Sequence, residues 1–290
     1  MIHFVGAGPG ATDLITVRGL KLLERADVII YAGSLVNPKL LDAAKPACRI
    51  YNSARMTLED VIGVMEDAEK RGLMTVRLHT GDPSVYGAVR EQMEELEKRG
   101  IEYDVTPGVS SFCGAAASLG MEYTLPGISQ SVILTRMEGR TKVPEKETIE
   151  SFAAHGTTMV LFLSSGMTGE LAKRLMEGGY SPKTPAAIVY KATWPEEQCL
   201  TCTVETLEST AAENGINRTA LIIVGEAVRY NRLSGRRNAR ENGKPIKSGN
   251  PEEATHGFEK SRLYDAGFTT GYREAGNGKK ETGTSPQRRT

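Results

Sequence analysis

Asp82 is the residue of this chain that is best placed to do chemistry, within the stretch His79-Thr-Gly-Asp-Pro-Ser-Val-Tyr-Gly87. The apolar run 74–78 before it is typical of a β-strand. Gly81 tolerates backbone conformations that other residues resist, and Pro83 favours an extended backbone at Asp82. Ligands of open α/β sheets bind outside the carboxyl ends of the strands, so this carboxylate would face a ligand there. The alternative is a turn in which Asp82 only hydrogen-bonds its own backbone.

Two arginines, Arg136 and Arg140, stand four residues apart in the run Thr135-Arg-Met-Glu-Gly-Arg-Thr141, at the end of a predicted strand. Guanidinium groups bind carboxylates through paired hydrogen bonds, so this loop suits a polyanionic ligand. The alternative is a solvated loop that binds no ligand.

Two further motifs resemble binding sites but do not predict a dinucleotide site or a metal site. The run Gly6-x-Gly8-x-x-Ala11 follows a strand as a dinucleotide-binding loop does, but Pro9 has no N–H for a pyrophosphate, and the second strand ends without an acidic residue for a ribose. Cys199 and Cys202 form a lone CxxC pair with no second ligand pair. In a strand, residues three apart point to opposite faces, so we expect ordinary thiols and no metal site.

The elements that must position these residues alternate between strand and helix, which predicts an α/β fold. In the first half, the predicted strands are 2–6, 27–31, 74–79 and 101–105, and the predicted helices are 13–24, 57–71, 89–99 and 112–119. Thr12 or Asp13 would cap the first helix, and Thr57 with Asp60 is close to a capping box for the second. We expect this half to form a parallel sheet.

A Pro-Gly break at 126–127 then separates a second half. Its predicted strands are 131–136, 158–163, 186–190, 198–204 and 220–224, and its helices 145–154, 168–177 and 205–213, which together indicate a mixed sheet. We therefore expect an N-terminal α/β domain at 1–124, a C-terminal α/β domain at 125–229 and a tail at 230–290. Residues 232–260 lack periodicity and predict disorder.

Composition indicates a globular protein, with 39% hydrophobic and 25% charged residues among 290. No apolar run reaches the roughly 20 residues of a membrane span, and no secretory signal opens the chain, so we expect a cytoplasmic protein with reduced cysteines. The tail 230–290 holds 13 Lys and Arg against 7 Asp and Glu, while the rest holds 23 and 29. A basic tail can bind nucleic acid or an acidic partner, but it more often serves solubility, and we expect neither nucleic acid nor membrane as a partner.

Taken together, six segments resemble the class III, S-adenosylmethionine-dependent tetrapyrrole methyltransferases, in that family's order along 1–229. They are Val5-Gly-Ala-Gly-Pro-Gly10, Thr80-Gly-Asp-Pro83, Pro107-Gly-Val-Ser-Ser111, Thr158-Met-Val-Leu-Phe-Leu163, Ala187-Ile-Val-Tyr-Lys-Ala-Thr193 and Arg218-Thr-Ala-Leu-Ile-Ile-Val-Gly225. Within the family, the chain resembles the branch that methylates precorrin-4 or cobalt-precorrin-4 at C11 in cobalamin biosynthesis. That resemblance rests on Tyr31-Ala-Gly-Ser-Leu-Val36, the 135–141 loop and Ser261-Arg-Leu-Tyr-Asp265, and the last of these predicts an ordered piece at 261–273.

The resemblance implies a homodimer that binds S-adenosylmethionine in the cleft between two α/β domains, and a tetrapyrrole substrate beside it. Carried over by position, the cofactor would contact Pro9, Thr80, Gly81, Asp82, Val85, Ser110, Ser111, Leu163, Ala192 and Thr219. For the substrate's acetate and propionate groups, the candidates are Arg55, Arg136 and Arg140.

The chain departs from family members that methylate uroporphyrinogen. Those relatives carry an Asp at the position of Ala32, proposed as a general base, and a Lys near Ser53, and both are absent here. The departure argues against uroporphyrinogen as the substrate and leaves the base unassigned. The alternatives are another tetrapyrrole position, diphthine synthesis on a protein side chain, or a non-catalytic adenine-nucleotide sensor on the same scaffold.

Overall fold

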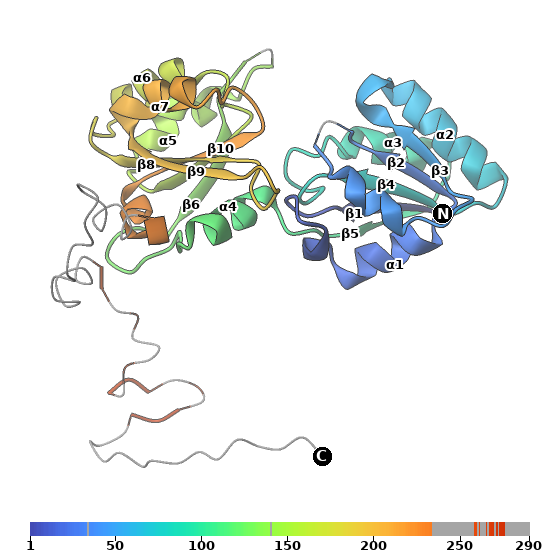
Figure 1. Ribbon diagram of the computed structural model, residues 1–290, viewed down its shortest axis with the longest axis horizontal. Helices are drawn as coiled ribbons and strands as arrows, with labels where there is room; N and C mark the ends of the chain where they lie inside the picture. Colours follow the sequence, from blue (N-terminus) through green and yellow to red (C-terminus); the bar gives the residue numbers. More distant parts are fainter. Residues whose placement is uncertain are drawn as a thin grey trace.

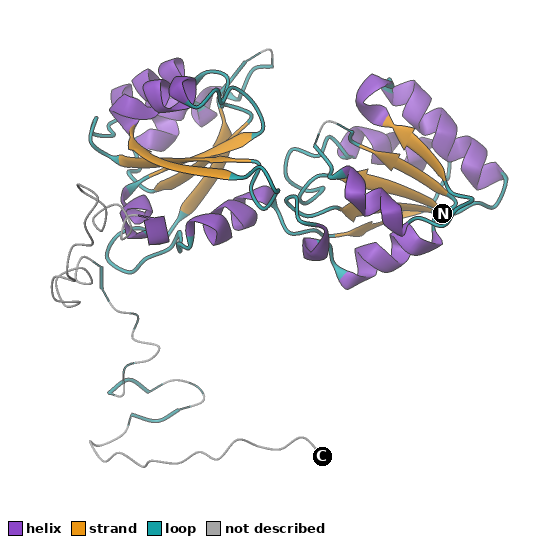
Figure 2. Cartoon of the chain, in the orientation of Figure 1, coloured by secondary structure: helices purple, strands orange, loops and turns teal. Residues whose placement is uncertain are grey.

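The computed structural model describes residues 1–33, 35–139 and 141–233, together with 258–259, 261, 265, 267–269, 271 and 273–275. In this part of the chain two separate sheets form, each flanked by helices (Figure 1, Figure 2). No helix within these ranges has the length and apolarity to cross a membrane. The predicted disorder at 232–260 lies outside the described residues except at 232–233 and 258–259, and the predicted ordered piece at 261–273 is described only in part, so both stay predictions.

The first sheet is parallel throughout, as predicted. Its spatial order is β3 (Arg49–Asn52), β2 (Val28–Tyr31), β4 (Thr75–His79), β1 (Ile2–Gly6) and β5 (Tyr103–Thr106). Helix α1 (Val17–Arg25) and the 3₁₀ turn η2 (Pro38–Ala43) cover one face, and α2 (Leu58–Lys70) and α3 (Arg90–Lys98) cover the other. Because β1 and β4 are neighbours at the centre, the loops that follow them meet at the carboxyl edge.

Helix starts in this domain follow local capping chemistry. Thr57 accepts from the Asp60 N–H while the Asp60 carboxylate accepts from the Thr57 N–H, so the predicted capping box of α2 is confirmed. The predicted cap of the first helix is wrong, because residues 12–14 form a separate 3₁₀ turn, η1 (Thr12–Leu14). The helix starts after Thr16, whose hydroxyl accepts from the Gly19 N–H. A further 3₁₀ turn, η3 (Ser53–Arg55), follows β3.

The second sheet is mixed, which confirms the prediction. Its order is β6 (Val132–Arg136), β7 (Thr158–Phe162), β10 (Ala220–Val224), β8 (Pro185–Tyr190) and β9 (Gln198–Thr203), and β6 and β7 are its parallel pair. One face carries α5 (Ile149–Ala153), α6 (Thr168–Glu177) and α7 (Leu207–Glu213) with the 3₁₀ turns η4 (Glu145–Glu147) and η5 (Val204–Thr206). The other face carries α4 (Ser111–Leu119) and η6 (Glu226–Tyr230).

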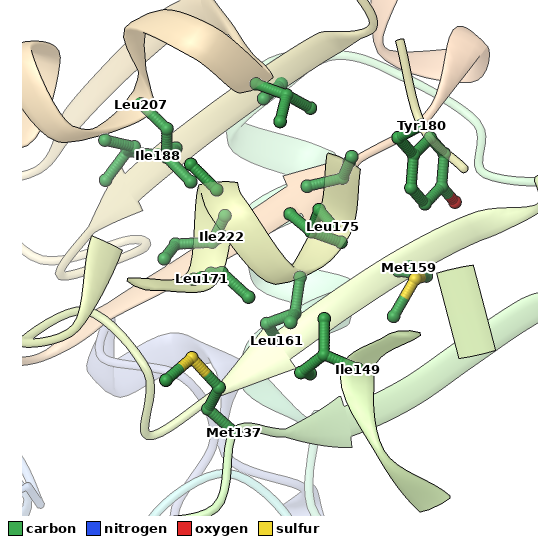
Figure 3. Packing of buried hydrophobic residues seen from close by; sticks show 14 of the residues in the cluster. Met137, Ile149, Met159, Leu161, Leu171, Leu175, Tyr180, Ile188, Leu207 and Ile222 are labelled. Carbon is green, nitrogen blue, oxygen red and sulfur yellow. The ribbon is translucent and has the colours of Figure 1, made fainter. Parts of the chain in front are cut away.

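The core of the second domain lies between this sheet and its helices. Leu171 and Leu175 of α6 pack over Leu161 of β7 and Ile222 of β10, and all four side chains are fully buried (Figure 3). Strands β7 and β10 are buried on both faces, which explains their continuous apolar sequence. This core holds rigid the strand ends from which one wall of the site is built.

Helix α4 follows the first sheet in sequence but packs on the second. Its Ala115 and Leu119 share a buried cluster with Val160 of β7 and Ile223 of β10. This packing places α4 with the C-terminal sheet, although α4 precedes the boundary predicted after residue 124. That boundary stays a prediction. The segment between β5 and α4 therefore passes from one domain to the other.

Strand β4 buries two basic side chains on the face that α2 and α3 cover. Arg77 donates to Gln92 Oε1 at 3.0 Å and to the Ile30 carbonyl at 3.2 Å. His79 stacks on Phe4 at 6.0 Å between ring centroids, and its Nε2 has no hydrogen-bond partner among the described residues. Burial, followed by the positive charge of Arg77, lowers the pKa of His79 to about 3.

Because the pKa of His79 is lowered in the folded state, protonation of this one residue makes the free energy of unfolding depend on pH. The unfolded chain binds a proton at His79 below about pH 6.5, and the folded chain resists it until about pH 3, so stability is lost as pH falls through this window. Between pH 7 and 4 we expect wild type to lose about 3 kcal/mol more than the His79→Phe variant. Urea unfolding at several pH values measures this difference, and parallel curves for the two proteins would contradict it.

Candidate active site

Three loops at the carboxyl edge of the first sheet are joined mainly through their backbones. The Gly8 N–H donates to the Gly81 carbonyl at 3.2 Å, and the Gly81 N–H donates to the Gly8 carbonyl at 2.8 Å. The Cα atoms of Gly6 and Gly108 lie so close that a Cβ on Gly6 would be 2.5 Å from Gly108 Cα. The Gly8 N–H is therefore already paired and not available to a pyrophosphate.

Asp82 connects two of these loops. Its Oδ2 accepts from the Gly108 N–H at 2.8 Å, and its Oδ1 accepts from the Ser84 N–H at 2.8 Å and from the Ser84 hydroxyl. Burial raises the pKa of Asp82, but the three hydrogen bonds together lower it by more. The pKa of this carboxyl therefore lies below its usual range. Asp82 thus makes the local turn hydrogen bonds of the alternative interpretation, and the same carboxylate also joins the 80–83 and 107–111 segments.

The opposite wall is the β8–β9 loop of the second domain, which reaches across to the first. The Ala11 N–H donates to Thr193 Oγ1 at 2.9 Å, and the Trp194 indole N–H donates to the Pro9 carbonyl at 3.0 Å. Glu197 braces the loop by accepting from the Thr193 N–H and the Ser118 hydroxyl. We call the pair of contacts at Thr193 and Trp194 the latch.

A cavity of about 170 Å³ lies between the two walls. All ten residues predicted to contact the cofactor line it: Pro9, Thr80, Gly81, Asp82, Val85, Ser110, Ser111, Leu163, Ala192 and Thr219. The structure thus brings together segments from both sheets, and their binding of a cofactor stays a prediction.

Backbone strain is concentrated at this cavity. Among the described residues, six that are not glycine have positive φ, and four of these line the cavity: Tyr86, Leu163, Lys191 and Thr219. Such conformations cost about 1–3 kcal/mol each and persist where the surroundings enforce them, often at functional sites. Leu163 and Tyr86 are also 65% and 46% exposed, so both offer apolar surface to a ligand in the cavity.

A model of the tetrapyrrole (corrin/porphyrin) methylases matches residues 1–208 of the chain. This protein belongs to that family. It is 52% identical over 227 residues to the cobalt-precorrin-4 C11-methyltransferase of Methanocaldococcus jannaschii, covering 78% of this chain and 88% of the relative. It is 42% identical to the enzyme of the same name from Priestia megaterium, covering 94% and 97%, and 46% identical to the precorrin-4 C11-methyltransferase of a Sinorhizobium species, covering 77% and 88%.

Solved structures agree with this family assignment. The X-ray structure of a cobalt-precorrin-4 methyltransferase, a cobalamin biosynthetic enzyme, superposes with a TM-score of 0.77 at 47% identity, covering 78% of this chain and 95% of that one. The uroporphyrin-III C-methyltransferase of Thermus thermophilus, solved with S-adenosyl homocysteine, gives 0.67 at 29% identity, covering 79% and 98%. The expectation of two α/β domains in a tetrapyrrole methylase is confirmed at the level of the fold.

The arginines proposed for substrate binding lie outside the described lining of this methylase's cavity. Arg55 is exposed on η3. Arg136 donates to three carbonyls of its own loop, those of Met137, Thr141 and Lys142, at 2.9–3.2 Å. Arg140 is outside the described residues. The loop after β6 is therefore braced by one of the two guanidinium groups that were expected to meet a ligand, and substrate binding by all three arginines stays a prediction.

The cavity of this methylase also has lining residues that the sequence argument did not select, namely Leu35, Tyr86, Phe162, Ser165, Val189, Lys191, Trp194, Ala220 and Leu221. Four of them, Phe162, Val189, Ala220 and Leu221, are apolar strand residues and look like core in the sequence. Trp194, the one tryptophan of the chain, directly follows a family motif and could have been selected on that basis.

The two cysteines of the CxxC pair behave as the sequence predicts. Cys199 packs with the cluster beneath α4, and Cys202 packs with the cluster beneath α6 and α7, so the two lie on opposite faces of β9. Burial, followed by the charge of Glu197, raises the pKa of Cys199 to about 12. This thiol is therefore protonated and unreactive at neutral pH.

Proposed function

We propose that this methylase transfers a methyl group from S-adenosylmethionine to C11 of precorrin-4 or cobalt-precorrin-4, a step of cobalamin biosynthesis. The observation that carries the proposal is the identity of 42–52% to relatives of that name from Priestia megaterium, a Sinorhizobium species and Methanocaldococcus jannaschii, over at least 88% of their lengths. Identity to uroporphyrinogen-III C-methyltransferase of Bacillus subtilis is 31%. The absence of an acidic residue at Ala32 agrees with this difference.

The chemistry of the cavity fits S-adenosylmethionine. Phe162, Leu163 and Leu221 offer an apolar surface to a purine. In the 107–111 segment of the first wall, the Ser110 hydroxyl forms no hydrogen bond with other described residues although the residue is only 7% exposed, and Ser110 stands at the start of α4. The N-terminal N–H groups of a helix favour a carboxylate such as that of the methionine part.

When bound, the cofactor would supply a methyl group already activated on a sulfonium. An electron-rich ring carbon would form a bond to that methyl in line as the methyl–sulfur bond breaks, with S-adenosyl homocysteine as the leaving group. The chain's own task is to hold the two reactants in line and to exclude water. Alignment of this kind contributes roughly 7–11 kcal/mol to lowering a barrier, so no strongly activated side chain is required. The latch keeps the two walls at one separation, and the Asp82 hydrogen bonds hold two loops of the first wall together. The general base for C11 stays unassigned.

Incubation with precorrin-4, with and without cobalt, and methyl-labelled S-adenosylmethionine tests the proposal when the label is located by NMR. Label at C11 is the expected result, and the preferred substrate distinguishes the cobalt-bearing from the metal-free pathway. Label at another carbon would show a different tetrapyrrole position. Tight cofactor binding without transfer to either substrate would favour diphthine synthesis or the nucleotide sensor.

For substrate recognition we propose Arg136, Arg140 and Arg55 as partners of the acetate and propionate groups. The double variant Arg136→Ala/Arg140→Ala should raise the tetrapyrrole KM about tenfold and leave S-adenosyl homocysteine affinity within about twofold. Arg140→Ala alone is the matched control, because it keeps the Arg136 hydrogen bonds that brace the loop. Unchanged substrate kinetics in the double variant would remove both residues from the site. The resemblance also leads us to propose a cytoplasmic homodimer, whose oligomeric state sedimentation velocity measures.

A further inference from the structure

The cavity between the two walls has very few charged residues. Within its described lining, the charged side chains are Asp82 and Lys191. Both oxygens of Asp82 already accept hydrogen bonds from Ser84 and Gly108. Lys191 is therefore the cation that this lining offers to a ligand.

The position of the Lys191 ammonium is set by the backbone and by two aromatic rings. Lys191 has φ +45° at the end of β8, and its N–H donates to the Thr219 carbonyl at 3.0 Å. Its Nζ lies 5.1 Å from the ring centroid of Trp194 and 5.7 Å from that of Tyr190. Trp194 is part of the latch, so one of the two rings beside the ammonium is itself held by a contact with the first domain.

The ammonium retains capacity for an anionic ligand. Its ion pair with Glu196 spans 3.7 Å, and the Glu196 side chain is 61% exposed, so that attraction is weakened by water. An ammonium has three N–H donors, and the structure shows no hydrogen bond from the Lys191 ammonium to another described residue, so it can still donate to a carboxylate. The part of the chain outside the tail carries an excess of six acidic residues, which makes a local cation more important for an anionic ligand.

We propose that Lys191 binds a carboxylate of the ligand in this cavity, an inference that rests on the proposed methyl transfer. The carboxylate has two sources: the methionine part of the cofactor, or an acetate or propionate of the tetrapyrrole. Both would pair with the same Nζ by a charge-assisted hydrogen bond. The two sources are separated by which ligand loses affinity.

Lys191→Met keeps an unbranched side chain and removes the charge, and Lys191→Arg keeps the charge. We would measure calorimetric binding of S-adenosyl homocysteine and of 5′-methylthioadenosine, which lacks the amino-acid carboxylate, and the tetrapyrrole KM. Lys183→Met is the matched control, because Lys183 also pairs with a glutamate but lies outside the cavity.

If the carboxylate is the cofactor's, Lys191→Met lowers affinity for S-adenosyl homocysteine about tenfold or more and leaves that for 5′-methylthioadenosine unchanged. If it is the substrate's, both affinities hold and KM rises by a similar factor with kcat preserved. In either case Lys191→Arg, which keeps the charge, retains most of the wild-type affinity or KM. Equal loss of both nucleosides would show that Lys191 only supports Trp194, and no change in any constant would equally overturn the proposal. Failure of wild type to bind S-adenosyl homocysteine would instead refute the proposed function.

Discussion

Replacing Gly108 with alanine is expected to destabilise the protein by more than about 3 kcal/mol, because the new Cβ would meet backbone atoms that cannot move aside. It would lie 2.1 Å from the Gly81 carbonyl oxygen and 2.8 Å from Gly6 Cα. Three loops from three strands meet at this point, so any shift also alters the cavity. We expect a large fall in the free energy of unfolding and loss of S-adenosyl homocysteine binding.

Urea unfolding measures the first effect, and Gly63→Ala is its matched control. Gly63 lies inside α2, and a Cβ there would meet nothing within 4 Å. Alanine loses less conformational freedom in a helix than glycine, so this variant should be stabilised by about 0.5–1 kcal/mol. If Gly108→Ala unfolded at the same midpoint urea concentration as wild type, the close approach of the loops would not be needed for stability.

Asp82→Ala is expected to weaken S-adenosyl homocysteine binding at least tenfold while the protein remains folded. The change removes the link between the Gly108 N–H and the 80–83 segment, and both segments line the cavity. Hydrogen bonds to a charged group stabilise by about 1.5–3 kcal/mol, so the thermal midpoint should fall by several degrees without loss of the fold. Calorimetry gives the affinity, and a thermal melt gives the midpoint.

Ser84→Ala is the control for Asp82, because it removes the hydroxyl donor and keeps the carboxylate and its bond from Gly108. It should retain most of the affinity. The lowered pKa of Asp82 means that its stabilisation is present above the unfolded pKa of about 3.9 and is lost as pH falls below that value. A sharp fall in thermal midpoint with unchanged affinity of the folded protein would mean that Asp82 serves only its turn.

The sequence by itself determined the features that depend on neighbours along the chain. The alternation of apolar segments predicted both sheets and their parallel or mixed character, and each predicted strand has a counterpart in the first or second sheet. The capping box at Thr57 needs residues only three apart, and it was found. The Gly-Asp-Pro loop was placed correctly at the carboxyl edge, because a strand end and a turn signal are both local.

Tertiary structure decided the features that join distant segments. The latch joins residues 182 and 185 positions apart, and no local pattern marks such a contact. The guanidinium of Arg136 donates to carbonyls of its own loop, which no local pattern marks, and its binding of a ligand stays a prediction. The positive φ of Lys191 has no sequence signal, because lysine disfavours that conformation and adopts it only where surrounding contacts enforce it. Propensity and periodicity act over a few residues, whereas the cavity is formed where two separately folded sheets meet.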